Sequence, residues 1–156
     1  MVRLDKASKT YRTKHGDVQA MDRVSLQIQK GEFVVIRGPS GSGKTTLLLS
    51  AGGMLRPTEG QVIVNNTDIY AMRKKERAIF RSENIGFVFQ LFHLVPYLNI
   101  IDNVLLPSCV GRSRFGQQDA KEWLSRLNLE ERMHHRPSEL SAGEKQRTAI
   151  ARAMLK

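Results

Sequence analysis

The residues with the clearest chemistry form the stretch GPSGSGKT at positions 38–45, which matches the pattern G-x-x-x-x-G-K-[ST] in full. Glycines at these positions let successive backbone N–H groups turn toward one anion, and a following helix adds its positive end. Lys44 can then reach the β- and γ-phosphates of a nucleoside triphosphate, and the Thr45 hydroxyl can ligate Mg²⁺. A glycine-rich connection without a ligand is the alternative, but an apolar run precedes the loop and a helix-like run follows it. The pattern between these flanks predicts a nucleoside-triphosphate site.

A second candidate anion site is LSAGE at positions 140–144. Ser141 and Glu144 have the spacing of a capping box, in which the serine caps the first helical turn and the glutamate reaches back. That local role is enough to explain where a helix starts. The same geometry also makes an exposed helix N-terminus attractive to a phosphate group.

Strand-like runs dominate the first part of the chain and position the first loop. EFVVIRG at 32–38 is a short, nearly continuous apolar run, which is typical of a strand buried on both faces. VSLQIQ at 24–29 alternates apolar and polar residues as a half-exposed strand does. IGFVF at 85–89 predicts another buried strand. We therefore expect a sheet that carries the loop at 38–45 on one of its strands.

Turns and helices account for the rest. Asn65 and Asn66 tolerate the left-handed conformation of a tight turn, so residues 61–69 predict a hairpin. The segments with helical character lie at 45–52, 72–81, 99–106, 117–129 and from 142 to the end. Strands early and helices late predict an α/β domain.

Composition limits the class of protein. The chain has 156 residues, of which 40% are hydrophobic and 26% charged, as expected for one soluble globular domain. The single cysteine, Cys109, cannot form an intramolecular disulfide and fits a reducing compartment. The N-terminal MVRLDKASKTY lacks the apolar core of a signal peptide. The uncharged stretch 84–101 is interrupted by polar residues and a proline, and therefore does not predict a membrane span.

The formal net charge of +10 is compatible with nucleic acid or an anionic membrane surface as a partner. The sequence shows no basic stripe with interleaved aromatic residues and no helix-turn-helix pattern, so we expect no direct nucleic-acid binding.

The ordered set GPSGSGKTTLL, IGFVFQ and LSAGEKQRTAIARA resembles the ATP-binding subunits of ABC transporters, in which these are the Walker A loop, the Q-loop and the signature motif. The resemblance covers essentially the whole chain, and IGFVFQLFHLVPYLNIIDNVLLP is most similar to the lipoprotein-release and macrolide-efflux branch. It implies a P-loop NTPase fold of the ABC ATPase type, with an N-terminal antiparallel β part and an incomplete central sheet. The implied parts of this partial domain at 1–156 are a P-loop core at 1–90, a helical subdomain at 91–139, and the signature motif with its helix at 140–156.

The resemblance also implies roles for single residues. Tyr11 would stack on adenine, although an ordinary strand aromatic is the alternative. Gln90 would contact Mg²⁺ or the attacking water, although it can instead be a polar residue that ends the IGFVF strand. Ser141 and Gly143 would bind the γ-phosphate of ATP held by a second subunit. The loop residues that would bind ATP are Gly38, Pro39, Ser40, Gly41, Ser42, Gly43, Lys44, Thr45 and Thr46, with Lys44 and Gln90 catalytic and Thr45 and Gln90 on Mg²⁺.

Two positions depart from the family's LSGGQ. Ala142 replaces a glycine and Glu144 replaces a glutamine, which adds a negative charge one turn from the expected phosphate. Either change could weaken closure of a dimer.

The implied function is that of an ATP-binding subunit with ATP and Mg²⁺ as cofactors, cytoplasmic and peripheral on the inner face of the membrane. Its partners would be an integral membrane permease and a second ATP-binding subunit, arranged head to tail around two ATP molecules. The resemblance leaves the transported substrate open, and its branch favours export over import.

The family's Walker B Asp-Glu and switch histidine would follow Lys156, and Asp68 is no substitute because it lies in the hairpin ahead of Gln90. We therefore expect an open edge beside the strand at 32–38 and no Mg-ATP turnover above a Lys44→Ala control. The alternatives are a complete, non-catalytic nucleotide-binding remnant or regulatory protein, and an ABC-type ATPase that acts on nucleic acid or the ribosome.

Overall fold

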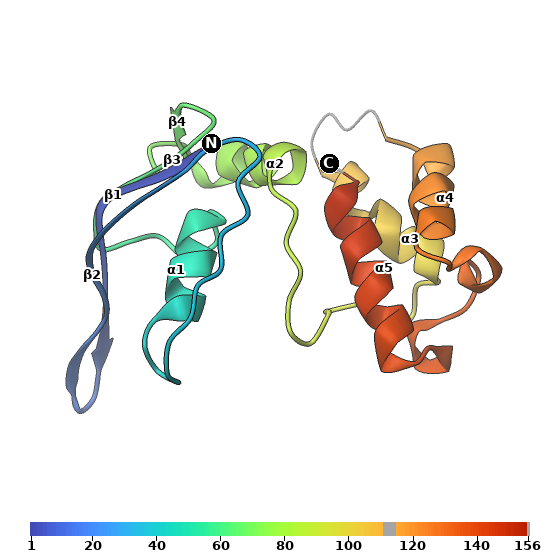
Figure 1. Ribbon diagram of the computed structural model, residues 1–156, viewed down its shortest axis with the longest axis horizontal. Helices are drawn as coiled ribbons and strands as arrows, with labels where there is room; N and C mark the ends of the chain where they lie inside the picture. Colours follow the sequence, from blue (N-terminus) through green and yellow to red (C-terminus); the bar gives the residue numbers. More distant parts are fainter. Residues whose placement is uncertain (111–114, 156) are drawn as a thin grey trace. The chain divides into compact units, whose positions relative to one another are not determined.

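A computed structural model describes residues 1–110 and 115–155. The chain forms two compact units, Met1–Arg77 and Ala78–Lys156. The first contains a sheet and one complete helix, and the second is helical (Figure 1). The division expected from the resemblance, after residue 90, concerns function and stays a prediction.

The sheet of the first unit is antiparallel throughout, with strand order β2-β1-β3-β4. Its strands are β1 (Val2–Thr13), β2 (Gly16–Ile28), β3 (Glu59–Val64) and β4 (Thr67–Asp68). The helix α1 (Lys44–Ala51) contacts β1, β2 and β3. The apolar residues that the strands bury are Leu4, Ala7, Met21, Val62 and Val64. Burying one face of the sheet therefore fixes α1, and with it the loop that leads into α1.

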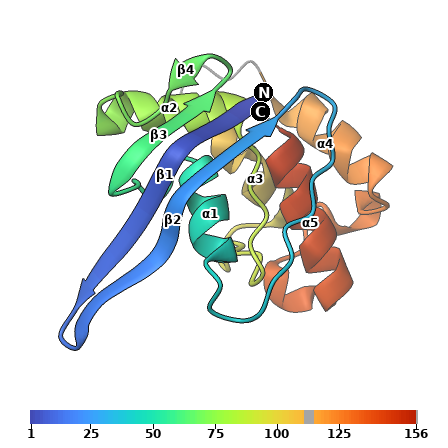
Figure 2. The ribbon, with the colours of Figure 1, turned by 60° about the vertical axis from the view of Figure 1, so that its left-hand side comes forward.

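The two hairpins differ in their support. The turn between β3 and β4 holds Asn65 and Asn66 at φ 48° and 63°, which confirms the predicted hairpin. In the β1–β2 hairpin, β2 pairs with β1 as far as Thr13, whereas β3 pairs with β1 only as far as Ser8. The outer half of this hairpin is consequently a two-stranded ribbon that ends in a tip (Figure 2).

Two predicted strands are absent from the structure. Residues 32–38 and 85–89 have no strand conformation, and neither segment pairs with any strand in the described part of the chain. Phe33 is 91% exposed instead of buried. The prediction was wrong because an apolar run becomes a strand only when a neighbouring strand satisfies its backbone N–H and C=O groups.

The second unit packs its helices around one apolar core. Its complete helices are α3 (Ile100–Leu105), α4 (Gln117–Arg126) and α5 (Ala142–Met154), with short 3₁₀ turns η1 (Leu106–Cys109), η2 (Glu130–Arg132) and η3 (Pro137–Glu139). Each of the three α-helices contacts the other two. The core residues include Ile100, Val104, Leu124, Leu129 and Leu155, all fully buried.

The remaining helix, α2 (Lys74–Asn84), begins two residues later and ends three residues later than the predicted 72–81. Over residues 1–110 and 115–155, we find no helix with the length and apolar character that crossing a membrane requires.

Candidate nucleotide-binding site

The loop at 38–45 wraps around the ammonium group of its own lysine. Lys44 Nζ donates to the carbonyl oxygens of Gly38 (2.8 Å) and Pro39 (2.6 Å), and it lies 3.4 Å from Ser42 Oγ. Gly41 and Gly43 have φ values of +80° and +85°, a backbone conformation that side-chain-bearing residues rarely adopt. The loop therefore has the turn that its glycines predict, and it holds a cation at its centre.

Helix α1 begins directly at this loop. Gly43 is its N-cap, and the carbonyl of Gly43 accepts from Leu47 N at 2.9 Å. The first turn of α1 contains no acidic residue, so nothing there cancels the positive end of the helix. Thr45 is exposed, whereas Thr46 is 9% exposed and packs inward. The positive N-terminal end of α1 and the exposed Thr45 are therefore suited to an anion bound in front of the helix.

The backbone of β2 lies very close to the loop at Gly43. A Cβ on Gly43 would lie 2.0 Å from the backbone oxygen of Ala20, a contact that real Cβ atoms essentially never make. A Cβ on Gly38 would meet Ser42 Oγ at 2.8 Å. Gly43 is thus required both for its left-handed backbone and for the approach of β2.

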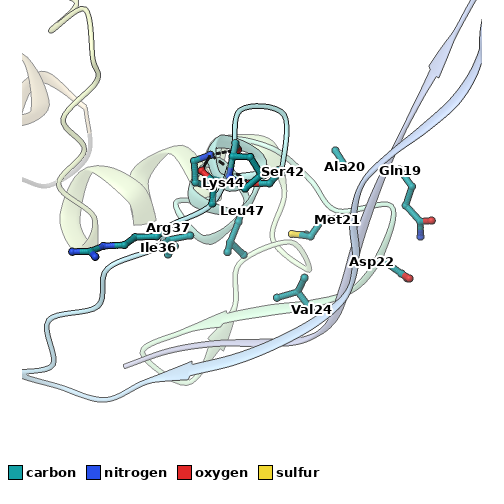
Figure 3. Close-up of a pocket in the computed structure, with 13 residues that line it drawn as sticks. Gln19, Ala20, Met21, Asp22, Val24, Ile36, Arg37, Ser42, Lys44 and Leu47 are labelled. Atoms are coloured by element: carbon teal, nitrogen blue, oxygen red, sulfur yellow. Dashed lines mark hydrogen bonds between the residues drawn. The ribbon is translucent and has the colours of Figure 1, made fainter.

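A cavity of about 400 Å³ lies between β2 and the loop. Met21 and Val24 point from β2 toward Leu47 of α1, whereas Gln19 and Asp22 point away from it (Figure 3). Sequence reasoning missed these β2 residues. The alternating pattern of the strand was the only signal available, and it does not say what the apolar face covers.

Tyr11 lies outside the lining of this cavity. It faces Val18 across the β1–β2 hairpin, its side chain is 38% exposed, and the Lys9 ammonium lies 5.4 Å from the ring centroid. Its ring is accessible, but the structure does not bring it to the loop cavity.

The donor set of the loop suits a metal carried by phosphate and not one caged by protein. Among the described residues, no group of three or more His, Cys, Asp or Glu side chains could hold a metal ion. Mg²⁺ commonly takes one or two protein ligands and completes its shell with phosphate oxygens and water. Thr45 is an exposed residue with a hydroxyl group at the end of the loop, which fits that requirement.

In the second unit, Gln90 is exposed and precedes a strained turn. Phe92 and His93 have φ values of 59° and 46°, and their carbonyl oxygens both accept from the Arg152 guanidinium, at 2.7 Å for His93. Burial lowers the pKa of Arg152 from its usual value. Arg152 thus ties the end of α5 to the segment after Gln90, a link that sequence reasoning missed because the partners lie about 60 residues apart.

The N-terminus of α5 has the predicted capping box. Ser141 Oγ accepts from Glu144 N at 3.3 Å and donates to Glu144 Oε2 at 2.7 Å, and Ser141 N donates to the same Oε2 at 2.8 Å. Arg132 Nε donates to Glu144 Oε1 at 3.1 Å. The two hydrogen bonds from Ser141, followed by the one from Arg132, lower the pKa of Glu144 to about 2.

Gly143 is exposed beside Ser141. A Cβ there would have only Arg147 Nη1 nearby, at 3.7 Å. Ser141 and Gly143 are therefore together at an open helix end, and the glycine leaves its backbone accessible.

Comparison with known proteins places these features in a family. The profile of the family described as ABC transporter matches residues 21–156. The chain is 41% identical to the lipoprotein-releasing system ATP-binding protein LolD of Bacteroides thetaiotaomicron, covering 99% of this chain and 70% of that protein. It is also 41% identical to the uncharacterized ABC transporter ATP-binding protein YvrO of Bacillus subtilis, covering 99% and 69%. Among solved structures, the dimeric post-hydrolysis state of the ATP-binding cassette MJ0796 bound to ADP and Pi matches with a TM-score of 0.92 and 40% identity, covering 99% of this chain and 69% of that one.

Proposed function

The chain belongs to the ABC transporter family of ATP-binding proteins, and we propose that its P-loop holds ATP with Mg²⁺ while its α5 N-terminus completes the ATP site of a second copy. The observation that carries this proposal is the loop itself. The carbonyl oxygens of Gly38 and Pro39 accept from the Lys44 ammonium, Gly41 and Gly43 supply the left-handed turns of the loop, and the helix that follows has no acidic residue in its first turn.

The residues divide the work by their chemistry. Lys44 would exchange the carbonyl oxygens of Gly38 and Pro39 for phosphate oxygens, because a triphosphate is the stronger acceptor for an ammonium group. The exposed hydroxyl of Thr45 would ligate Mg²⁺, which neutralises charge on the β- and γ-phosphates. Gln90 would contact Mg²⁺ or orient the attacking water, and Tyr11 would offer an accessible ring face to adenine.

The second copy would be recognised through the other unit. Ser141 and Gly143 offer a hydroxyl and a backbone at an exposed helix N-terminus, which is the geometry that attracts a phosphate group. The dimeric cassette among the similar structures supports a pair of subunits.

The membrane partner is proposed from the relatives and from exposed apolar residues. Leu91 and Tyr97, which follow Gln90, are each 77% exposed. Exposed apolar side chains gathered in one segment mark contact surfaces for other proteins. We propose that residues 91–139 receive a permease of the lipoprotein-releasing type, which would place the chain on the cytoplasmic face of the membrane.

Binding of a fluorescent ATP analogue in Mg²⁺ tests the loop. Lys44→Ala should weaken binding about tenfold or more, because it removes a charge-assisted contact to phosphate. Lys121→Ala, at an exposed position of α4, is the matched control and should bind like the wild type. Equal binding by the Lys44→Ala chain would overturn the proposal.

Light scattering tests the second half of the site. At low ionic strength, where the net charge of +10 keeps copies apart without nucleotide, the wild-type mass should double with ATP but not with ADP, and Ser141→Ala should reduce the doubling. An unchanged monomer at saturating ATP would contradict the shared site.

The membrane partner is tested by a charge at the exposed apolar segment. Leu91→Asp should reduce copurification with a lipoprotein-releasing-type permease without changing ATP binding.

A further inference from the structure

The start of α5, where we propose that a phosphate binds, carries a negative charge of its own. Glu144 lies one turn into the helix, its side chain is 19% exposed, and its carboxylate is ionised at neutral pH, since its hydrogen bonds lower a pKa that is ordinarily 4.5. A carboxylate so close to an incoming phosphate repels it, since like charges disfavour one another most where water is partly excluded. Some group must offset this charge if the helix end is to accept an anion.

Arg132 is the group that meets this charge. Within the described residues, the ion pair of Glu144 is with Arg132, from the short turn η2. The guanidinium is itself positioned by a second contact, since Arg132 Nη1 lies 3.4 Å from His135 Nε2. Arg147, another cation of this helix, has its Nη1 3.7 Å from the position of a Cβ on Gly143.

The two oxygens of the Glu144 carboxylate have different partners, and this determines what the Ser141 hydroxyl is free to do. Arg132 binds Oε1, whereas the backbone N–H and the hydroxyl of Ser141 both bind Oε2. The hydroxyl has one proton, so it can donate to a phosphate only by leaving Oε2. When it leaves, Oε2 keeps the Ser141 N–H and Oε1 keeps Arg132, so the carboxylate stays paired.

We propose that Arg132 is a positioning residue of the α5 phosphate site, which neutralises and anchors Glu144 so that Ser141 can turn its hydroxyl to the γ-phosphate. This inference rests on the proposed function, because the phosphate is the one held by the second copy. It also explains how a glutamate is tolerated at this position of the helix. Arg132 contacts Glu144 and not the nucleotide.

The test is a double-mutant cycle on ATP-dependent association, measured by analytical ultracentrifugation with the whole chain. Arg132→Met should weaken association about tenfold or more, because it exposes the phosphate to an unbalanced carboxylate. Adding Glu144→Gln to Arg132→Met should restore association, and Arg132→Lys should retain most of it. Arg126→Met is the control, because Arg126 is another exposed arginine that pairs with a glutamate, Glu122 on α4.

Two further readouts separate this role from a structural one. The pKa of Glu144, followed by NMR, should rise in Arg132→Met, and binding of the ATP analogue to the P-loop should stay at the wild-type level in every variant. If Arg132→Met does not fold, Glu144→Gln alone decides, since association at least as tight as wild type supports the proposal and a tenfold loss overturns it.

The outcomes distinguish the two proposals. Absence of ATP-dependent association in the wild type removes the shared site and the role of Arg132 with it. Wild-type association that Arg132→Met leaves unchanged refutes the role of Arg132 alone. If Arg132→Met weakens association and the added Glu144→Gln does not restore it, Arg132 acts on folding and the proposal is also refuted.

Discussion

At the scale of single residues, two glycines of the loop at 38–45 have similar backbone angles but differ in how much space a side chain would find. Gly41 and Gly43 have nearly the same positive φ, but a Cβ on Gly41 would meet nothing within 4 Å. A Cβ on Gly43 would meet the Ala20 oxygen of β2. A backbone atom in a paired strand cannot move aside as the end of a flexible side chain can.

This difference predicts that Gly43→Ala abolishes binding of the ATP analogue, whereas Gly41→Ala retains it. Both substitutions carry the strain of a left-handed alanine, about 1–2 kcal/mol. Gly43→Ala must in addition displace the loop from β2. The two affinities, measured together with melting temperatures, check the prediction, and comparable affinities for the two variants would contradict it.

Glu144 predicts a specific dependence of stability on acid. Its pKa is about 2 in the folded chain against an ordinary value of 4.5, so the unfolded chain takes up its proton first. The contribution of Glu144 to stability is therefore fully present above pH 4.5 and is lost as the pH falls toward 2. Urea unfolding of the wild type and of Glu144→Gln between pH 6 and pH 2 should converge at the acid end. A gap that stays constant over this range would show that Glu144 titrates normally.

At the scale of elements, one buried amide in α3 organises the loop that precedes this helix. Asn103 is fully buried and accepts from Val95 N at 2.7 Å. The two protons of its Nδ2 are shared among the carbonyl oxygens of Val95, Leu98 and Asn99, which lie 3.0, 3.2 and 2.9 Å from the nitrogen. The segment after Gln90 thus depends on a side chain of α3 for its backbone hydrogen bonds.

We expect Asn103→Asp to destabilise the chain by about 2 kcal/mol or more, because a buried carboxylate has no N–H to offer the carbonyl oxygens of the loop. Asn99→Asp is the matched control. Asn99 caps α3 by accepting from Asp102 N at 2.8 Å, and aspartate caps a helix equally well. Chemical denaturation of both variants measures the difference, and equal stabilities would show that Asn103 does not hold the loop.

At the scale of the whole molecule, charge and exposed apolar surface act against each other. The net charge of +10 keeps copies of the chain apart at low ionic strength. Phe33, Val34 and Val35 are 91%, 43% and 57% exposed, and their backbone is not part of the sheet in the described residues. An exposed apolar segment with free backbone groups promotes pairing between chains.

We therefore expect self-association that does not depend on ATP and that grows with salt, because salt screens the net charge. Phe33→Lys should reduce it, whereas Val18→Lys should not, since Val18 is 53% exposed but lies in a paired strand. Light scattering between low and high salt, without nucleotide, measures the effect. If both lysine variants behave alike, the segment at Phe33 is not the contact.

Much of the candidate site could be predicted from sequence because its geometry is local. The loop at 38–45, the Asn65-Asn66 turn and the capping box at Ser141 each depend on residues a few positions apart. Such features carry their own backbone requirements, namely left-handed glycines or asparagines and a serine that caps its own helix. The resemblance added the order of the motifs and therefore the family.

The tertiary structure decided what depends on distant neighbours. Residues 32–38 and 85–89 have the composition of strands but lack a strand to pair with in the described chain, and no local pattern contains that information. The approach of Ala20 to Gly43, the ion pair between Arg132 and Glu144, and the hold of Arg152 on the turn at Phe92 all join residues that the sequence separates. The sequence by itself determined that this chain carries a glycine-rich turn before α1 and a capped helix at α5, because those are short-range backbone preferences. Packing determined which side chains pair with the charge on Glu144 and hold the turn at Phe92. Only folding brings Arg132 and Arg152 within hydrogen-bonding distance of these groups.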